Sequence, residues 1–217
     1  MKHKSGKKKR IYSLANVVVQ KYIERTALLM GRKFDVQTFM VVLCCKPWFV
    51  FASPGYARVS LSHFATAGFG RKDCGILGQK LVHETGLAVQ ERSPYFCSLR
   101  VSSTLSLSDL QGDLVRQGLL QSGDHYHSEV FARMKEVMRL IFVKSKDKLG
   151  AKFGCFEIFS FDFVLSATDL RPWLVDITSN PSFATEMLGN GTLIKTLLRD
   201  VTYMARDVHE VGLKSTT

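Results

Sequence analysis

Long apolar runs are missing from this sequence. The longest uninterrupted one, Phe39–Cys45, is far shorter than the ~18 residues expected of a membrane-spanning helix. The N-terminus is rich in lysine instead of apolar residues, so no secretory signal is evident. These two absences argue against a membrane span and against secretion, and they predict a soluble protein of the cytoplasm.

The sequence also lacks the cysteine spacings of a metal cluster or a disulfide framework. Five cysteines are present, an odd number, and no two of them form a C-x-x-C pair. Reduced thiols are therefore the expected state. Internal repeats are absent, which excludes a repeat solenoid. With 217 residues, 46% of them hydrophobic, the chain is long enough for one packed domain or for part of a larger one.

Positive charge is what the sequence has in excess. The formal net charge is +11, and residues 1–10 carry six lysines and arginines and no acid. We therefore divide the chain into a basic tail, 1–10, and a folded domain, 11–217. Such a tail is typical of a solvated arm, an import signal or a contact for a polyanion. Aromatic residues are not interleaved with the basic ones, which disfavours nucleic acid and leaves an acidic protein surface as the expected partner.

The first part of the chain is built of short runs of branched and aromatic residues, which favour strands. Lys46-Pro47 and Pro54-Gly55 punctuate these runs and predict turns. The connections are short, so the strands should form an antiparallel meander. The runs expected to be strands are Asn16–Ile23, Arg32–Cys45, Trp48–Ser53 and Tyr56–Leu61.

The second of these runs alternates polar with apolar residues, as on a half-buried strand. Lys33 and Asp35 lie two residues apart, so they should point from one face of the strand toward the same cleft. A simple surface ion pair is the alternative.

Helical periodicity appears later in the chain. Residues 107–120, 128–143 and 192–209 each carry an apolar stripe at helical spacing and should pack on a sheet. Residues 62–82 are rich in glycine without a sustained period, and we expect a loop there. Strands dominate the first part and helices join them later, so the predicted fold class is α+β.

The stretch Phe156–Pro181 predicts a hairpin, because two apolar runs flank a segment of turn-forming residues. If its loop is centred on Asp169, then Asp162 lies opposite Asp176 and Ser160 lies opposite Thr178. Facing carboxylates lie roughly 5 Å apart at Cβ and repel each other unless a positive charge offsets them. Mg²⁺ suits such a pair, since it commonly takes one or two protein carboxylates and completes its shell with water and phosphates. The alternative is a pair of solvated acids on the wet face.

Several motifs make the sequence resemble the tubulin tyrosine ligase-like family of ATP-grasp enzymes. They occur in the family's order, at compatible spacings, along nearly the whole chain. The segment Gly55–Leu61 is most similar to members of the polyglycylase type. The motifs are Val19–Ile23, Gly31–Val36, Phe161–Phe163 and Trp173–Pro181.

The resemblance implies a fold in which a largely antiparallel sheet, flanked by helices, grips ATP. It also implies a reaction in which ATP phosphorylates a carboxylate and an amino-acid amine attacks the acyl-phosphate to form an amide. ATP and Mg²⁺ are the implied cofactors. By the same resemblance, the expected partners are tubulin or other acidic protein tails, with glycine or glutamate as the amino acid. The implied locations are the cytoplasm and microtubules, including a cilium or flagellum axoneme.

The resemblance also implies roles for particular residues. Lys33 and Arg58 would be catalytic, and Arg58 would face the phosphates or the acceptor carboxylate, where its planar fork can bind two oxygens. The expected nucleotide contacts are Gln20, Lys21, Ile23, Lys33, Asp35 and Thr85. The expected Mg²⁺ ligands are Asp162, Asp176 and Thr178.

Some positions depart from the family pattern. Asp176 stands where the family has glutamate, Thr178 where it has asparagine, and Gln37 where it has arginine. The His83–Gly86 segment keeps the threonine of a His-Leu-Thr-Asn motif and loses its asparagine. The family's upstream strands, which carry phosphate-binding lysines, are absent unless the basic tail is their remnant, so the chain looks truncated.

Two functions therefore remain open at the level of sequence. The first is an ATP-dependent ligase that adds amino acids to protein carboxylates, as in tubulin polyglycylation or polyglutamylation. The second is a catalytically impaired relative that binds microtubules or nucleotide without turnover. The departures at Gln37, Asp176 and Thr178 are the features that separate them, because Mg²⁺ tolerates little error in geometry.

Overall fold

The computed structural model describes residues 18–64, 80–93, 96, 103–123, 125–150, 152, 154–181, 183 and 187–214. Within these residues, a sheet with four longer strands, β2, β3, β5 and β6, forms the centre of the fold. The strands are β1 (Leu28–Leu29), β2 (Arg32–Cys45), β3 (Trp48–His63), β4 (Thr104–Leu105), β5 (Glu157–Leu165) and β6 (Pro172–Ser179). The helices are α2 (Leu87–Gln90), α4 (Leu107–Arg116), the π-helix η5 (Tyr126–Phe131), α5 (Ala132–Ser145), the 3₁₀ turn η6 (Lys146–Lys148) and α6 (Met187–Lys214).

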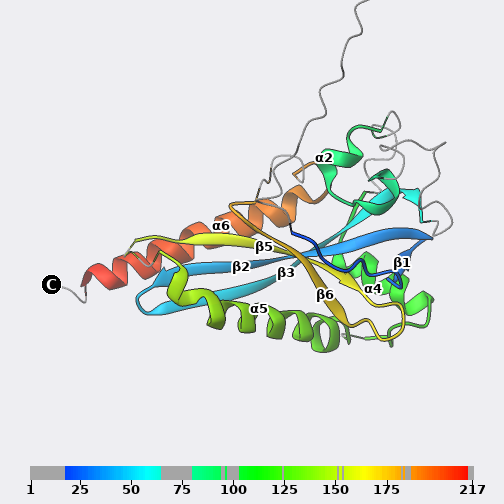
Figure 1. Ribbon diagram of the computed structural model, residues 1–217. Coiled ribbons are helices and arrows are strands. Elements are labelled where there is room, and N and C mark those ends of the chain that lie inside the picture. Colours follow the sequence, from blue (N-terminus) through cyan, green and yellow to red (C-terminus); the bar gives the residue numbers. More distant parts are fainter. Residues whose placement is uncertain are drawn as a thin grey trace, which may run out of the picture.

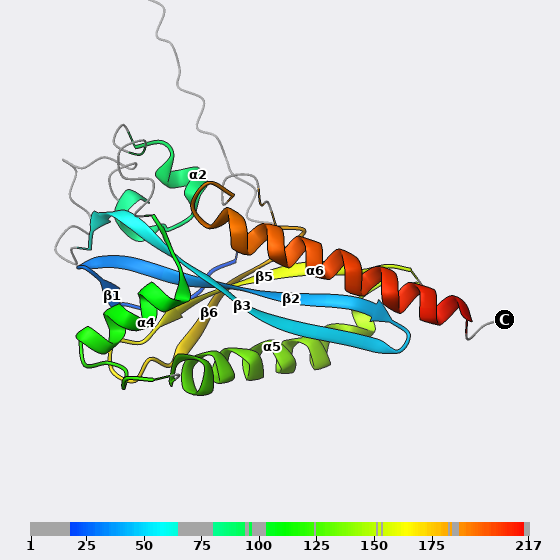
Figure 2. The ribbon, with the colours of Figure 1, turned by 180° about the vertical axis from the view of Figure 1, so that it is seen from behind.

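The strands form one antiparallel sheet in the order β4-β3-β2-β5-β6, with β1 paired to β2. Helices lie on both sides of it: α6 runs along one face, and α4 and α5 lie against the other (Figures 1 and 2). This arrangement confirms the expected α+β fold with a largely antiparallel sheet flanked by helices. No helix in the described part of the chain is both long and apolar enough to span a membrane.

Strand β2 lies in the middle of the sheet, and all of its residues are buried. Its alternate side chains point to opposite faces. The even-numbered residues Phe34, Val36 and Met40 belong to the core beneath α4 and α5. The odd-numbered residues from Phe39 onward pack with α6 residues such as Ile194 and Val201. The half-buried strand expected from the alternation is thus covered on both sides.

The polar residues at the start of β2 share a face with the residues under α6. Lys33, Asp35 and Gln37 precede Phe39 at the same two-residue spacing. We call Lys33, Asp35 and Gln37 the polar half of this face. The apolar half consists of Phe39, Val41 and Leu43.

The turn expected at Pro54-Gly55 is not present. Strand β3 continues through both residues, and the pairing shifts there from Gln37 with Tyr56 to Phe39 with Ser53. The extra residue makes a β-bulge. Gly55 has φ +71° and lies so close to β2 that an added Cβ would be 1.7 Å from the carbonyl oxygen of Gln37. Glycine therefore allows a bulge where its dipeptide signature suggested a turn.

The strand expected over Asn16–Ile23 is wrong for its described part, because residues 18–24 have no regular secondary structure. Val18 and Val19 are 84% and 92% exposed. Branched residues favour a strand only where a neighbouring strand and a core can receive them, and these two side chains have no such surroundings. Residues 16 and 17 lie outside the described part of the chain.

The expected helices are present with shifted ends. Helix α4 begins at Leu107 as predicted, with the Ser106 hydroxyl accepting from the Asp109 N–H, and it ends at Arg116. The second expected helix is η5 followed by α5, and the third is α6. Of the loop expected over residues 62–82, Ser62 and His63 complete β3, residues 80–82 are helical, and 65–79 lie outside the description. Cys44, Cys45 and Cys155 are free thiols, as expected.

Candidate active site

The sheet register brings one row of side chains together across four strands. Tyr56 on β3 is opposite Gln37 on β2, and Gln37 is opposite Asp162 on β5. Asp162 in turn is opposite Asp176 on β6. The predicted pairing of Asp162 with Asp176, and of Ser160 with Thr178, is confirmed. The row crosses the sheet at the polar half of the β2 face.

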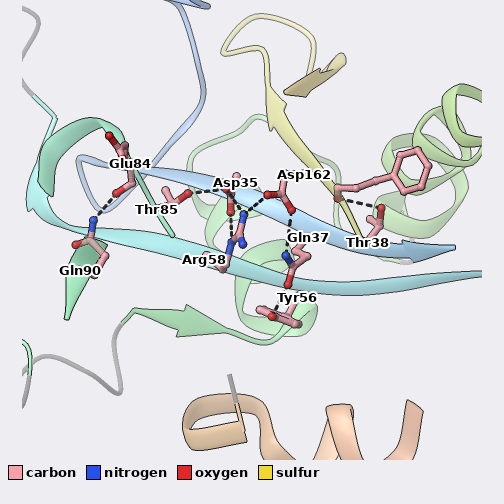
Figure 3. Close-up of polar contacts among 10 residues, drawn as sticks. Asp35, Gln37, Thr38, Tyr56, Arg58, Glu84, Thr85, Gln90 and Asp162 are labelled. Atoms are coloured by element: carbon pink, nitrogen blue, oxygen red, sulfur yellow. Dashed lines mark hydrogen bonds and ion pairs between the residues drawn. The ribbon is translucent and has the colours of Figure 1, made fainter. Parts of the chain in front are cut away.

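Arg58 is the centre of the charged cluster in this region (Figure 3). It is the β3 partner of Asp35 and binds it with two hydrogen bonds, Nε to Oδ1 at 2.9 Å and NH2 to Oδ2 at 2.6 Å. The same NH2 group lies 2.7 Å from Oδ2 of Asp162. One guanidinium therefore joins two carboxylates on β2 and β5, with side-chain exposures of 9% for Arg58 and Asp35 and 16% for Asp162.

The pKa values of Arg58 and Asp162 are both raised above their usual values. Burial alone would lower the pKa of Arg58, but the charges and hydrogen bonds of Asp35 and Asp162 outweigh it and raise that pKa well above its usual value. The pKa of Asp162 is raised, chiefly by burial and also by the charge of Asp35, against the opposing effects of Arg58 and Gln37. Arg58 thus remains charged. Burial disfavours the ionised form of Asp162, and the contacts with Arg58 and Gln37 stabilise that form.

Thr85 and the segment around it close the cluster on the side of Asp35. The Thr85 hydroxyl donates to Asp35 Oδ2 at 2.5 Å. Gln90 fixes this segment to the sheet, since its side-chain oxygen accepts from the Leu61 N–H at 2.8 Å while its amide donates to the carbonyl of Glu84 (Figure 3). Gln90 is fully buried, and no sequence pattern had marked it.

Lys33 belongs to a neighbouring group of polar contacts. Its ammonium donates to the Tyr22 hydroxyl at 3.1 Å and lies 4.4 Å from the centre of the Tyr22 ring. The same hydroxyl is 2.9 Å from Nδ1 of His83. Burial lowers the pKa of Lys33, with the charge of Asp35 opposing it. The alternative of a surface ion pair between Lys33 and Asp35 is wrong, because both are buried and Asp35 pairs with Arg58.

The expected adenine contacts lie together at a cleft of about 690 Å³. Gln20, Lys21 and Ile23 line one side of it, and hairpin residues including Leu174 and Val175 line the other. The Gln20 side-chain amide donates to the carbonyl of Val175 at 3.0 Å. A larger cavity of about 730 Å³ lies elsewhere, between β3 and α6. Val41 of the apolar half lines this cavity, and none of the expected nucleotide contacts does, so the smaller cleft is the candidate for adenine.

The expected Mg²⁺ ligands differ in their surroundings. Asp176 and Thr178 are exposed on β6, whereas Asp162 is largely buried, so the alternative of two acids on a wet face fails for Asp162. Both oxygens of Asp162 have protein partners, Gln37 at Oδ1 and Arg58 at Oδ2. The positive charge that the facing acids require is thus supplied at Asp162 by Arg58.

The donor set nevertheless fits a hard cation. The three expected ligands offer only oxygens, and Asp176 and Thr178 face solvent, where water and phosphate could complete a shell. The described residues contain no group of three or more histidines, cysteines or acids placed to hold a metal by themselves.

Residues 3–211 match the sequence profile of the tubulin-tyrosine ligase family. The chain belongs to this family. The match covers nearly all of the chain, and it confirms the resemblance drawn from the motifs on β2, the hairpin and the segment that lines the cleft.

Similar proteins carry the names of polyglycylases, one of them inactive, and of a probable tubulin polyglutamylase. Protein polyglycylase TTLL10 of Rattus norvegicus is 31% identical over 171 residues, which make up 77% of this chain and 24% of the rat protein. A human relative named inactive polyglycylase TTLL10 is 30% identical and shares 83% of this chain and 26% of its own length. Probable tubulin polyglutamylase TTLL9 of Bos taurus is 26% identical, over 87% of this chain and 38% of the bovine protein. The chain thus spans only about a quarter to two fifths of these relatives.

Proposed function

We propose that this chain is an ATP-dependent ligase that forms amide bonds on protein carboxylates, of the tubulin polyglycylation or polyglutamylation type. The observation that carries the proposal is Arg58, held between two largely buried carboxylates, Asp35 on β2 and Asp162 on β5. Family membership supports the same reaction class. The net charge of +11 suits an acidic partner such as a tubulin tail, and hence a location on microtubules or an axoneme.

The proposed reaction has two steps. An oxygen of the acceptor carboxylate attacks the γ-phosphorus of ATP, ADP leaves, and an acyl-phosphate forms. The amine of glycine or glutamate then attacks the acyl carbon, loses a proton, and displaces phosphate. Phosphoryl transfer of this kind depends mainly on positioning and charge neutralisation.

The residues of this chain would divide that work. Gln20, Lys21 and Ile23 would bind adenine in the cleft beside the hairpin, and Lys33 would lie near the nucleotide. Asp162, Asp176 and Thr178 would hold Mg²⁺, which supplies charge neutralisation on the phosphates when bound.

Arg58 would bind the acceptor carboxylate or a phosphate. Its NH2 group now serves both Asp35 and Asp162, so an incoming anion must compete for it. Asp35 and Thr85 would keep the guanidinium in place during that exchange, because the Nε contact to Asp35 does not involve Asp162.

A second function has its own support. A relative that binds nucleotide or microtubules without turnover fits the exposure of Asp176 and Thr178 and the occupation of both Asp162 oxygens by protein donors. The neutral Gln37 at the position where the family has arginine also favours it.

Intact-protein mass spectrometry separates the two. A tubulin-tail peptide is incubated with the full chain, ATP, Mg²⁺ and either glycine or glutamate. The ligase predicts a mass gain equal to whole added residues, lost in Arg58→Ala and retained in the exposed control Arg139→Ala. No gain with either amino acid, while Mg²⁺·ATP still binds, would favour the second function.

A further inference from the structure

A buried tyrosine hydroxyl reaches the charged cluster through a glutamine. Tyr56 is 0% exposed, and its hydroxyl donates to Oε1 of Gln37 at 2.5 Å. Nε2 of Gln37 donates in turn to Oδ1 of Asp162 at 3.1 Å. Figure 3 shows Gln37 between the Tyr56 hydroxyl and the Asp162 carboxylate.

This chain of contacts sets the orientation of the amide. A glutamine side chain has one accepting oxygen and one donating nitrogen, and an ionised carboxylate only accepts. If the amide were reversed, its oxygen would face Oδ1 of Asp162, and two acceptors would meet without a proton. The proton donated by Tyr56 to Oε1 favours the orientation in which Nε2 faces Asp162.

The bulge at Gly55 makes this meeting possible. The pairing shift between Ser53 and Tyr56 places Tyr56 directly opposite Gln37, two residues before Arg58 on the same strand. Glycine permits the two strands to approach closely at this point, since a side chain on residue 55 would clash with the Gln37 carbonyl. Tyr56 and Arg58 therefore project from β3 toward the same face and approach Asp162 from two directions.

We propose that Tyr56 and Gln37 are positioning residues for Asp162: together they fix Oδ1 while Arg58 fixes Oδ2, so that the carboxylate presents its remaining lone pairs in one orientation. The inference deepens the proposed function, on which its ligand role rests. Neither residue touches the substrate, and both act through Asp162. Partners that orient a cation-binding side chain typically change metal affinity by about 10–100-fold when removed.

The test uses the full chain and three variants, Tyr56→Phe, Gln37→Met and the double variant. Binding of Mg²⁺·ATP is measured by titration calorimetry. The matched control is Tyr126→Phe: Tyr126 is also 0% exposed, and among the described residues its hydroxyl has no hydrogen-bond partner. A loss caused merely by removing a buried hydroxyl would appear in the control as well.

We expect Tyr56→Phe and Gln37→Met each to weaken Mg²⁺·ATP binding about tenfold, at the lower end of that range. The double variant should bind no more weakly than Gln37→Met, because Tyr56 acts through the amide. Unchanged affinity in Tyr56→Phe, or losses that simply add, would overturn the inference and leave the proposed function standing. A parent protein that binds no Mg²⁺·ATP would overturn both.

A second readout needs no ligand. The side-chain amide protons of Gln37, observed by NMR, should exchange slowly in the parent and in Tyr126→Phe, and measurably faster in Tyr56→Phe. Equal exchange in all three proteins contradicts the fixed amide even if every variant binds nucleotide normally.

Discussion

The apolar half and the polar half of the β2 face are both buried, but different interactions stabilise their side chains. In the apolar half, Phe39, Val41 and Leu43 pack against α6, and none of the three carries a polar side-chain group. In the polar half, Asp35 and Gln37 are buried to a similar degree, but their side chains are hydrogen-bonded, Asp35 to Arg58 and Gln37 to Tyr56. Residues of one strand face can therefore belong either to the core or to the candidate site, and the hydrogen-bond partners of their side chains distinguish the two.

The comparison also predicts how each half fails. Truncating a buried apolar side chain lowers the free energy of unfolding by an amount that increases with the cavity volume left behind. Removing the Arg58 guanidinium has a different effect, because it leaves the largely buried carboxylates of Asp35 and Asp162 without their counter-charge. The polar half should consequently be the more sensitive of the two to a single change, and four experiments test this from the largest expected effect to the smallest.

Arg58→Met should produce the largest loss. Breaking a buried ion pair by removing one partner costs about 3–5 kcal/mol in the free energy of unfolding, and here both Asp35 and Asp162 lose a partner. Urea denaturation measures it. Arg206→Met at an exposed position of α6, which removes a surface pair with Asp207, should leave the unfolding midpoint unchanged. Similar midpoints for the two variants would mean that the cluster contributes nothing to stability.

Ile194→Ala tests the apolar half. Ile194 is 0% exposed on α6, and its truncation should cost about 3 kcal/mol, within the usual range for a buried aliphatic side chain. Because none of the proposed ligand-binding residues lies on α6, the affinity for Mg²⁺·ATP should stay at the parent value at temperatures where the variant is folded. Weaker binding in proportion to the lost stability would show that the two halves are coupled.

Asp162→Asn tests the cation at the site. In the parent, Mg²⁺·ATP should raise the thermal midpoint, because a ligand at a hundredfold excess over its Kd stabilises the native state by about 2.7 kcal/mol. The variant should lose this shift, while its ligand-free stability changes little, since Arg58 keeps two hydrogen bonds to Asp35. An undiminished shift in Asp162→Asn would remove Asp162 from the proposed ligands.

The smallest effect concerns pH. Burial, and next the charge of Lys33, lowers the pKa of His83 below its usual 6.5. The unfolded chain then binds a proton at His83 before the folded one does, so the contribution of His83 to stability is complete above pH 6.5 and is lost as the pH falls through the folded pKa.

His83→Asn removes this titration and keeps a side chain that can bond the Tyr22 hydroxyl. Urea midpoints at pH 7 and pH 5 should therefore differ less in His83→Asn than in the parent. Parallel changes in the two proteins would show that His83 does not titrate abnormally.

Part of this site could be predicted from the sequence because it is local. The register of the β5–β6 hairpin follows from the alternation of the two strands and from the position of their loop, and it placed Asp162 opposite Asp176 correctly. The apolar stripes of α5 and α6 likewise follow from helical spacing, and both lie in the core. Family motifs identified the residues that line the cleft, although their roles remain predictions.

The errors have a different origin. Val18 and Val19 have strand-forming side chains, but nothing in the described part of the chain covers them. Pro54-Gly55 has the composition of a turn, yet neighbouring β2 approaches so closely that the chain forms a bulge instead. In both cases local propensity was overridden by the surroundings in the folded protein.

By itself, the sequence determined where the main strands and helices after residue 31 lie, except that β3 continues through Pro54-Gly55. It also determined which acids face each other in the hairpin and to which family the chain belongs. Only the tertiary structure decided that Arg58 joins Asp35 to Asp162, and that Tyr56 reaches Asp162 through Gln37. Gln37 and Asp162 are 125 residues apart in the chain. Their contact depends on the pairing of β5 with β2 in the sheet. The local sequence around each residue does not specify which distant strand will pair with its own.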